Sequence, residues 1–474
     1  MNLDSYTNIF IIGIKGVAMV HVATILKKMG KHVEGVDVGD EFITDHLLTT
    51  AGIRVHTTFD MALPDSVNLV LYSASHKGEH NPLVVQARTR GVRVLSQAAF
   101  LGQLMQLFTN RLAVCGCHGK TTTSSLLAYA LIQLHVSPSY LIGSSSFNTY
   151  DGGDYNGKDW FVIEADEYGV NPPHDLTPKF HLLSPTAVLC TNIDFDHPDV
   201  YRDLAHVTQA YRTFLNKAEN VVVCGDDPQL KGYAKKRRTR VSTYGYLPGN
   251  TYRIVNYETT ATGVTFDILH KEHIYEGFQT GIYGEKSILN AAGVVALLHT
   301  VGFEIDHIRQ ALIGFTGPKR RMEVLYVDDR YTVIDDYGHH PDEIRAVIEA
   351  LRARYDNRRL VVIFQPHTFS RTHAMLDGFA AALALADCAY VAPIFASARE
   401  PSDQFHVSSF DIESRAASSG HSHVVAFASK DALSIYAKEQ MRAGDVVVTL
   451  GAGDIYSVAD GIITHIISSS ASSS

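Results

Sequence analysis

The stretch LAVCGCHGKTTTSSL, residues 112 to 126, is the most informative segment of this chain. The apolar run from Leu112 to Cys115 is typical of a buried strand, and the segment from Thr122 to Leu134 has the apolar spacing of a helix. Gly116 and Gly119 lie between them and permit a tight turn. The stretch therefore predicts a strand, a glycine turn and a helix in immediate succession.

The turn carries the residue types that a triphosphate requires. Gly116 and Gly119 allow close approach of the backbone, Lys120 supplies a cation for the β- and γ-phosphates, and Thr121 supplies a hydroxyl for Mg²⁺. Val114 stands five positions before Gly119, so the loop is a shortened variant of G-x-x-x-x-G-K-[ST]. The alternative is a glycine turn followed by an exposed lysine. The strand before the turn and the helix after it favour a phosphate-binding loop.

Length and composition set further limits. The chain has 474 residues, which predicts about three domains. With 46% hydrophobic and 19% charged residues and a net charge of −9, it has the composition of a soluble globular protein without a broad nucleic-acid footprint. Five scattered cysteines indicate reduced thiols and a cytoplasmic location. No apolar run reaches 18 residues and the first residues lack a basic segment, so we expect neither a membrane span nor a signal peptide.

The N-terminal region reads as a βαβ unit. An apolar strand from Asn8 to Gly13 leads through Gly16 into a helix, and a second strand ends at Asp37. Lys15 stands where the dinucleotide fingerprint has its second glycine. We therefore expect a Rossmann-like binding domain, with an NAD site as the less favoured interpretation.

Acidic residues follow two later strands. Glu164 ends the strand that starts at Trp160, and Asp194, Asp196 and His197 follow the strand from Ala187 to Cys190. The carboxyl ends of parallel strands are where open α/β sheets bind ligands, and hard oxygen ligands suit Mg²⁺. The alternative for any one of these carboxylates is a helix N-cap.

The remaining sequence predicts a third α/β domain. Apolar strands at 331–335, 360–364 and 446–450 each end in polar or glycine-containing segments. We expect domains at 1–109, 110–324 and 325–466, followed by a disordered serine-rich tail at 467–474.

Taken in order, the motifs resemble the Mur ligase family. They are GIKGVAM, GCHGKTTT, EADE, TNIDFDHPDVY, GEKSILNAAG, GPKRRMEV, DDYGHHPDEI, FQPHTFSRT and LGAGDIY. The resemblance covers nearly the whole chain, and DDYGHHP with FQPH and SRT is most similar to the branch that joins L-alanine to UDP-N-acetylmuramate. It implies a Rossmann-like N-terminal domain for the UDP-sugar, a central P-loop ATPase and a Rossmann-like C-terminal domain. The implied reaction consumes ATP with Mg²⁺ and proceeds through an acyl phosphate.

The resemblance also implies roles for individual residues. Catalytic roles are expected for Lys120, Glu164, His197, His339 and Arg371. Nucleotide contacts are expected from Gly116, Gly119, Lys120, Thr121, Thr122, Asn290, Arg321 and Asp336, with Thr121, Glu164 and His197 as Mg²⁺ ligands. The UDP-sugar and the amino acid are expected to contact Gly13, Lys15, Gly16, Asp37, Ser73, Tyr337, His339 and Arg371. His339 is alternatively a helix-entry residue before Pro341.

The chain departs from the family pattern at several positions. Thr368 replaces an arginine that helps to grip the amino-acid carboxylate, and Lys15 replaces a glycine and is a candidate partner of the UDP diphosphate. Cys117 replaces a threonine of the family pattern, and Lys286-Ser287 replace a His-Asn pair near the expected adenine contacts. The alternatives are therefore a ligase that adds a recycled tripeptide or another amino acid, a catalytically silent homologue and, remotely, an NAD-dependent oxidoreductase.

Overall fold

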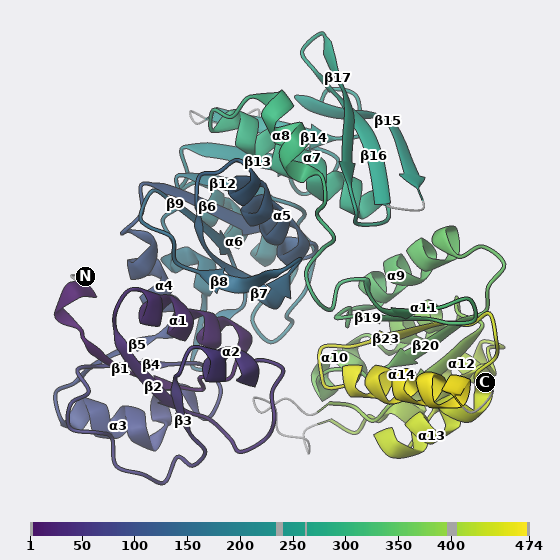
Figure 1. Cartoon of the computed structure of the whole chain (residues 1–474), viewed down its shortest axis with the longest axis horizontal. Coiled ribbons are helices and arrows are strands. Elements are labelled where there is room, and N and C mark those ends of the chain that lie inside the picture. The colour runs from purple at the N-terminus through teal and green to yellow at the C-terminus, as the bar shows by residue number, and fades with distance from the viewer. Residues whose placement is uncertain (1–2, 234–239, 261–262, 396–404, 472–474) are drawn as a thin grey trace. The chain divides into compact units, whose positions relative to one another are not determined.

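The computed structural model describes residues 3–233, 240–260, 263–395 and 405–471 (Figure 1). The chain divides into two compact units, Met1–Pro318 and Lys319–Ser474. The first unit holds a five-stranded and a ten-stranded sheet, and the second holds a six-stranded sheet. Within the described ranges, no helix is both long enough and apolar enough to cross a membrane.

The five-stranded sheet forms the N-terminal part of the first unit, with the order β3-β2-β1-β4-β5 and parallel pairing throughout. Its strands are β1 (Asn8–Ile12), β2 (His32–Val36), β3 (Arg54–His56), β4 (Leu69–Tyr72) and β5 (Arg93–Ser96). Its helical segments are η1 (Leu3–Ser5), α1 (Val17–Lys28), α2 (Asp45–Thr50), η2 (Gly78–His80), α3 (Pro82–Thr89) and α4 (Gln97–Met105). Strand β1 is central and almost wholly buried, as its unbroken apolar sequence predicts. The turn after β1 therefore lies where the strand order reverses, the usual place of a ligand in such sheets.

The ten-stranded sheet follows in the order β17-β16-β15-β14-β13-β12-β6-β9-β7-β8. Its strands are β6 (Asn110–Cys115), β7 (Ser139–Phe147), β8 (Tyr150–Asp154), β9 (Trp160–Glu164), β12 (Ala187–Cys190), β13 (Asn220–Cys224), β14 (Arg240–Gly245), β15 (Tyr252–Thr260), β16 (Gly263–His270) and β17 (His273–Thr280). Pairing is parallel from β15 to β7 in this order and antiparallel at both ends. Strand β6 lies inside the parallel part, so the glycine turn after it has a strand end on either side.

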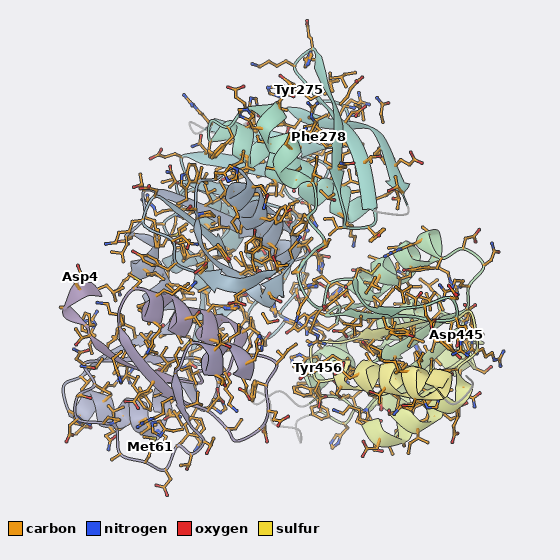
Figure 2. All side chains as sticks on the ribbon, viewed as in Figure 1. Asp4, Met61, Tyr275, Phe278, Asp445 and Tyr456 are labelled. Carbon is orange, nitrogen blue, oxygen red and sulfur yellow. The ribbon has the colours of Figure 1, made fainter. Side chains whose placement is uncertain are left out.

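Helices and a small hairpin complete the first unit. They are α5 (Lys120–Gln133), β10 (Gly169–Asn171), β11 (Asp175–Pro178), η3 (Lys179–Leu182), α6 (Leu204–Leu215), α7 (Glu285–Thr300) and α8 (Ile305–Leu312). Helices α5, α7 and α8 pack on one another, and α1 packs on β7 and β8, so the two sheets share one hydrophobic core. In the antiparallel end of the larger sheet, the rings of Phe266 and Phe278 stack with centroids 5.4 Å apart, and Figure 2 shows Phe278 near Tyr275 on β17.

The second unit is a six-stranded sheet between two layers of helices (Figure 1). Its order is β18-β19-β23-β20-β21-β22, and only β18 pairs antiparallel. The strands are β18 (Glu323–Val327), β19 (Thr332–Asp336), β20 (Leu360–Phe364), β21 (Cys388–Val391), β22 (Val424–Ala426) and β23 (Val446–Leu450). The helices are α9 (Pro341–Arg354), α10 (Phe369–Ala374), α11 (Leu376–Leu383), α12 (Ser409–Ser418), α13 (Lys430–Gln440) and α14 (Tyr456–Ala471). One core lies under α9, α11 and α12, and a second lies under α13 and α14.

In the structure, α14 continues to Ala471 and so includes the first part of the segment 467–474, for which the sequence predicts a disordered tail. The hydroxyl groups of Ser468 and Ser469 donate to the carbonyl oxygens of Thr464 and His465, each at 2.8 Å. These bonds to the preceding turn satisfy the serine hydroxyls within the helix, so a serine-rich composition does not end it. Residues 472–474 of the expected tail lie outside the described residues.

Candidate active site

The turn between β6 and α5 needs glycine at two positions. Gly116 has φ +141°, and a Cβ added there would lie 1.9 Å from Thr191 Oγ1. Gly119, the N-cap of α5, has φ +81°, and a Cβ added there would lie 2.9 Å from Asn290 Oδ1. The turn is therefore enclosed by the end of β12 and by helix α7. Asn290, expected on the nucleotide, lies against the glycine turn.

Lys120 is the first residue of α5, and its side chain folds back over the turn. Its Nζ donates to the carbonyl oxygens of Gly116 at 2.7 Å and Cys117 at 3.2 Å, and to Glu167 Oε1 at 2.9 Å. Burial alone would lower the pKa of Lys120, but the neighbouring carboxylates, Glu167 first, raise it above its ordinary value. The turn therefore holds a protonated ammonium group that is 14% exposed.

Thr121 and Glu164 form a second contact at the turn. Thr121 Oγ1 donates to Glu164 Oε1 at 3.1 Å, and Glu164 Oε2 accepts from Ser124 Oγ at 3.3 Å and from the Gly143 amide at 2.9 Å. Strand β9 pairs with β6, so the carboxylate at its end faces the hydroxyl at the start of α5. Thr122, the next residue of α5, is half-buried.

A compact group of possible metal ligands lies beside Lys120. His197 Nε2 is 3.6 Å from Glu167 Oε1 and 3.6 Å from Asp196 Oδ2, and one ligand atom of each residue lies within 4.8 Å of the others. Glu167 Oε2 is buried and has no hydrogen-bond partner among the described residues. A buried carboxylate oxygen without a hydrogen-bond partner, beside a second acid and an imidazole, suits a divalent cation. These three residues therefore fit a Mg²⁺ site.

The sequence pattern put forward the acidic residues after β9 and β12, together with His197, for Mg²⁺, and the family resemblance singled out Glu164 and His197 among them. The structure brings His197 to Glu167 and Asp196, whereas Glu164 contacts Thr121. The available signal was position, because Glu167 and Asp196 follow β9 and β12 as closely as the chosen residues do. The conformation of the turn after β9 determines which partner each carboxylate of EADE contacts. That conformation cannot be read from the local sequence.

The predicted UDP-sugar residues gather at the turn after β1. Gly13 has φ +78°, and Ser73 Oγ lies 2.4 Å from the position of an added Cβ. The Lys15 amide donates to Asp37 Oδ2 at 2.8 Å, which fastens the turn to the end of β2. Gly16 is the N-cap of α1. The predicted set is therefore contiguous at the switch point of the first sheet.

The Lys15 ammonium group does not point into this turn. Its Nζ donates to the Asp40 carbonyl oxygen at 2.6 Å and lies 3.3 Å from Asp45 Oδ2, with the Phe42 ring 5.3 Å away. The side chain is only 7% exposed. In this arrangement, Lys15 stabilises the segment before α2.

In the second unit, the residues predicted for the ATP ribose and for the amino acid lie at or after the carboxyl ends of β19 and β20. Asp336 Oδ1 accepts from the Gly338 amide and Oδ2 from the Met322 amide, each at 2.7 Å. Burial raises the pKa of Asp336 to about 6, although the nearby Arg321 charge and these two hydrogen bonds oppose the shift. The guanidinium of Arg321 lies 5.2 Å from the centroid of the Tyr337 ring.

His339 and Arg371 complete this predicted group. His339 Nδ1 lies 3.0 Å from the Tyr337 carbonyl oxygen, and its ring is 5.9 Å from that of His367, the residue before Thr368. Arg371 is a buried residue of the short helix α10. The N-cap of α9 is His340, so the helix-entry role considered for His339 belongs to its neighbour.

Arg320 has a structural role at the same strand ends. Its guanidinium donates to Asp335 Oδ2 at 2.8 Å and to the carbonyl oxygens of Gly451 at 2.7 Å and Gly453 at 3.1 Å. These bonds tie the chain before β18 to the ends of β19 and β23. Arg321 is therefore the member of the pair that remains for a ligand.

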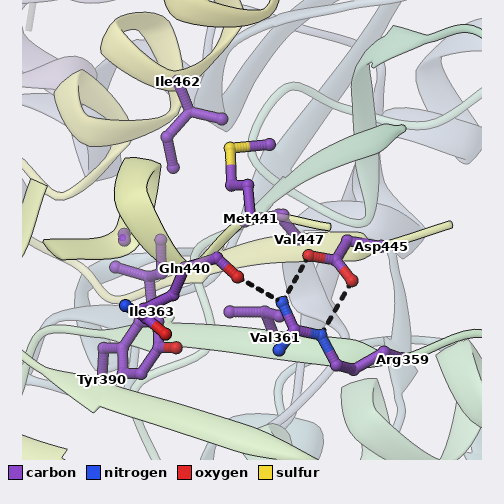
Figure 3. A pocket seen from close by; sticks show the side chains of 10 residues that line it. Arg359, Val361, Ile363, Tyr390, Gln440, Met441, Asp445, Val447 and Ile462 are labelled. Atoms are coloured by element: carbon purple, nitrogen blue, oxygen red, sulfur yellow. Dashed lines mark hydrogen bonds and ion pairs between the residues drawn. The ribbon is translucent and has the colours of Figure 1, made fainter. Parts of the chain in front are cut away.

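The cavity in Figure 3 lies at the opposite edge of this sheet. Arg359 there forms a two-pronged ion pair with Asp445, at 2.8 and 2.7 Å, and also donates to the Gln440 carbonyl oxygen at 2.7 Å. Arg359 and Asp445 immediately precede β20 and β23, so they lie at the amino ends of the strands. With apolar neighbours such as Ile462, this pair holds the sheet to its helices and lies away from the predicted acceptor residues.

The chain is similar to known proteins over nearly its whole length. Three family domains match in order: "Mur ligase family, catalytic domain" at 8–109, "Mur ligase middle domain" at 114–298, and "Mur ligase, glutamate ligase domain" at 320–453. The predicted α/β class and three-domain organisation are thereby confirmed, while the residue boundaries of the domains stay predictions.

Individual relatives cover almost the whole chain. The UDP-N-acetylmuramate–L-alanine ligase of Lactiplantibacillus plantarum is 35% identical over 455 residues, which are 96% of this chain and 97% of the relative. The enzyme of the same name from Desulfitobacterium hafniense is 33% identical, with 96% and 99% covered. Among solved structures, the UDP-N-acetylmuramate–alanine ligase of Thermotoga maritima has TM-score 0.82 and 25% identity, with 98% and 100% covered. A murein peptide ligase from Psychrobacter arcticus has TM-score 0.74 and 21% identity, with 97% and 98% covered, which shows a shared fold.

Proposed function

The chain belongs to the Mur ligase family, and we propose that it joins L-alanine to the lactyl carboxylate of UDP-N-acetylmuramate at the expense of ATP. This reaction is a step of peptidoglycan precursor synthesis. The observation that carries the proposal is the contact of Lys120 with Glu167 at the glycine turn, beside the Thr121–Glu164 pair. Near-complete coverage of relatives with this activity supports the same substrates.

In this reaction the protein acts mainly by positioning the substrates and by neutralising the charge of the phosphates. A lactyl oxygen attacks the γ-phosphorus and ADP leaves; the amine of L-alanine then attacks the acyl carbon and phosphate leaves. Lys120 exchanges its contacts with the turn for the β- and γ-phosphates, where its charge stabilises the transferring group. Gly116 and Gly119 let the backbone approach the phosphates, and Asn290 lies where the nucleotide meets the turn.

The metal is Mg²⁺ in this proposal, which supplies charge neutralisation on the phosphate oxygens when it is bound. Thr121 and Glu164 hold one ion, and His197 with Glu167 and Asp196 holds a second. The unpartnered Glu167 Oε2 supports this assignment, because a cation gives that buried oxygen the partner it lacks.

The second unit supplies the acceptor side. Arg371 binds the carboxylate of the amino acid, and Tyr337 with His339 borders the site. Asp336 contacts the ATP ribose and Arg321 the γ-phosphate, since its neighbour Arg320 is already bound within the unit.

A second candidate is a ligase that attaches a recycled tripeptide to the same sugar nucleotide. The specific observation is Thr368, which stands where the family has an arginine whose guanidinium would bind the carboxylate of a free amino acid. The Psychrobacter arcticus murein peptide ligase shows that the same fold occurs in a ligase of that name.

An acceptor screen separates the candidates. Purified protein with ATP, Mg²⁺ and UDP-N-acetylmuramate receives L-alanine, glycine, L-serine or the tripeptide L-alanyl-γ-D-glutamyl-meso-diaminopimelate, and ADP release is measured. We expect L-alanine to give the highest kcat/KM, and Lys120→Ala to be inactive with every acceptor, which excludes a contaminating ligase. Preference for the tripeptide would establish the second candidate, and no acceptor-dependent ADP release would contradict both.

A further inference from the structure

The end of β9 and the turn after it carry three carboxylates within four positions, and the proposed reaction uses two of them. Glu164 lies with Thr121, and Glu167 lies with Lys120 in the metal group. Asp166, which stands between them in the sequence, binds neither phosphate nor metal in that reaction. Because a triphosphate brings negative charge to this turn, a further carboxylate beside it requires a cation of its own.

Lys179, the first residue of η3, supplies this cation. Its Nζ donates to Asp166 Oδ2 at 2.7 Å, while Asp166 Oδ1 accepts from the Tyr168 amide at 3.0 Å. The Lys179 side chain is 16% exposed, and its Nζ lies 5.4 Å from the centroid of the Tyr168 ring. Both oxygens of Asp166 therefore have donors, and neither donor is Lys120.

The backbone on either side of Glu167 is bound to the same short helix. The Lys179 amide donates to the Tyr168 carbonyl oxygen at 2.9 Å, and the Phe180 amide donates to the Asp166 carbonyl oxygen at 3.0 Å. These bonds do not involve the Lys179 side chain. Removing that side chain therefore changes the partner of the Asp166 carboxylate and leaves the backbone bonds in place.

The charges of Lys120 and Asp166 act on each other. Burial alone would raise the pKa of Asp166, but the charge of Lys179, and after it that of Lys120, holds this pKa below its ordinary value. Burial alone would lower the pKa of Lys120; among the charges that raise it, that of Glu167 has the largest effect and that of Asp166 a smaller one. Without Lys179, Asp166 would therefore be an anion without an ion-pair partner that still acts on Lys120.

We propose that Lys179 is a positioning residue for phosphoryl transfer, because it neutralises Asp166 and holds that carboxylate away from Lys120. Lys120 then pairs only with Glu167 and the phosphates. Lys179 acts through Asp166 and does not itself contact the nucleotide. The inference rests on the proposed function, since it treats the turn after β6 as the ATP site.

The test measures nucleotide binding without turnover. Calorimetric titration of the full chain with the Mg²⁺ complex of β,γ-imido-ATP compares the parent with Lys179→Gln, which loses the charge, and Lys179→Arg, which keeps it. Both variants should fold, because a partly exposed ion pair contributes little to stability. We expect binding to weaken by about fivefold or more in Lys179→Gln, the effect of one uncompensated charge near the phosphates, and by about twofold or less in Lys179→Arg.

A second substitution separates this charge effect from a packing role. Combining Lys179→Gln with Asp166→Asn removes the carboxylate that Lys179 neutralises, so we expect the double variant to bind the analogue within about twofold of the parent. A packing role would leave the loss in place. Lys28→Met is the matched control, because Lys28 forms an ion pair with Asp154 between α1 and β8 of the same unit. This control should bind the analogue as the parent does.

Equal affinity in the parent and in Lys179→Gln would overturn the inference, as would a double variant that binds as weakly as Lys179→Gln. If the double variant does not fold, salt dependence decides. The loss in Lys179→Gln should shrink between about 50 mM and about 500 mM salt, because salt screens exposed charges, and a loss that is independent of salt would contradict the inference.

Turnover of the parent with UDP-N-acetylmuramate and L-alanine is measured beside these titrations. If the parent turns over and Lys179→Gln binds the analogue as the parent does, only this inference fails. If the parent binds the analogue without turnover, the proposed function fails, and the binding comparison still tests the role of Lys179. If the parent does not bind the analogue, both fail.

Discussion

Lys120 Nζ lies 2.9 Å from Glu167 Oε1, so the helix after the glycine turn is joined to the segment after β9 by a buried ion pair. Glu167 is almost wholly buried, and the same oxygen lies 3.6 Å from His197 Nε2, in the group formed with Asp196. One carboxylate thus orients the ammonium group for phosphate and borders the site assigned to a metal ion. We therefore expect removal of the Lys120 charge to slow phosphoryl transfer, and removal of the Glu167 charge to weaken metal binding.

Replacing Lys120 with Ala removes a charge that acts most fully in the phosphoryl-transfer transition state. We expect kcat to fall by about 100-fold or more, with little change in UDP affinity, because the Gly13 turn belongs to a different sheet. Steady-state kinetics and titration with UDP check the two parts. A kcat equal to that of the parent would show that the turn is not the ATP site.

Glu167→Gln keeps the shape of the side chain and removes its charge. We expect the Mg²⁺ concentration for half-maximal activity to rise by about tenfold, within the range found when metal-site partners are removed. Binding of Mn²⁺ followed by paramagnetic resonance provides a readout that does not depend on turnover. Asp199→Asn is the control, because Asp199 is a nearby acid that accepts from Tyr168 at 2.6 Å and lies outside the ligand group. The same Mn²⁺ affinity in Glu167→Gln and in the parent would exclude Glu167 as a ligand.

Thr368 precedes α10 with φ +68°, a conformation unfavourable for a β-branched residue. If Arg371 alone holds the amino-acid carboxylate, Thr368→Arg should lower the KM for L-alanine by about tenfold or more, since a charge-assisted hydrogen bond contributes about 1.5–3 kcal/mol. The KM for ATP should not change. An unchanged or higher KM for L-alanine would show that position 368 does not contact the amino-acid carboxylate.

His21 predicts a pH dependence of stability in the first unit. Its Nε2 lies 2.8 Å from the Ser144 carbonyl oxygen, its Nδ1 has no partner among the described residues, and burial lowers its pKa to about 4. The unfolded chain takes up a proton near pH 6.5 and the folded chain only near pH 4, so stability present above pH 6.5 is lost between these values. At 1.36 kcal/mol per unit, the loss approaches about 3 kcal/mol.

Urea unfolding of the parent and of His21→Gln at pH 7 and pH 4.5 measures this effect. The glutamine variant is less stable at pH 7 because His21 packs tightly against Gly152 and Gly153. The difference in free energy of unfolding should shrink or reverse at pH 4.5. A difference that is the same at both pH values would show that His21 does not titrate on unfolding.

The parts of the site that sequence predicted are those set by adjacent residues. Gly116, Gly119 and Lys120 follow from one strand, one turn and one helix, so their local pattern determines their arrangement. Glu164 was predictable for the same reason, because it ends a strand next to β6.

The remaining parts depend on contacts between distant segments. Glu167 reaches Lys120 across 47 positions, and His76 reaches Asp37 across α2, β3, β4 and the loops between them. Lys15 looked like a ligand for phosphate because its local pattern does not reveal Asp45, which takes up its charge. The partner of a long side chain depends on which residues the fold brings near it. The spacing of residues along the chain does not reveal that partner.

In the proposed reaction, ATP activates the lactyl carboxylate as an acyl phosphate before the amine attacks. UDP-N-acetylmuramate labelled with ¹⁸O at that carboxylate, incubated with the protein, ATP, Mg²⁺ and L-alanine, tests it most directly. Each inorganic phosphate released should carry one ¹⁸O atom, because the carboxylate oxygen that attacked the γ-phosphorus leaves with it. Product formation with unlabelled phosphate would contradict the account.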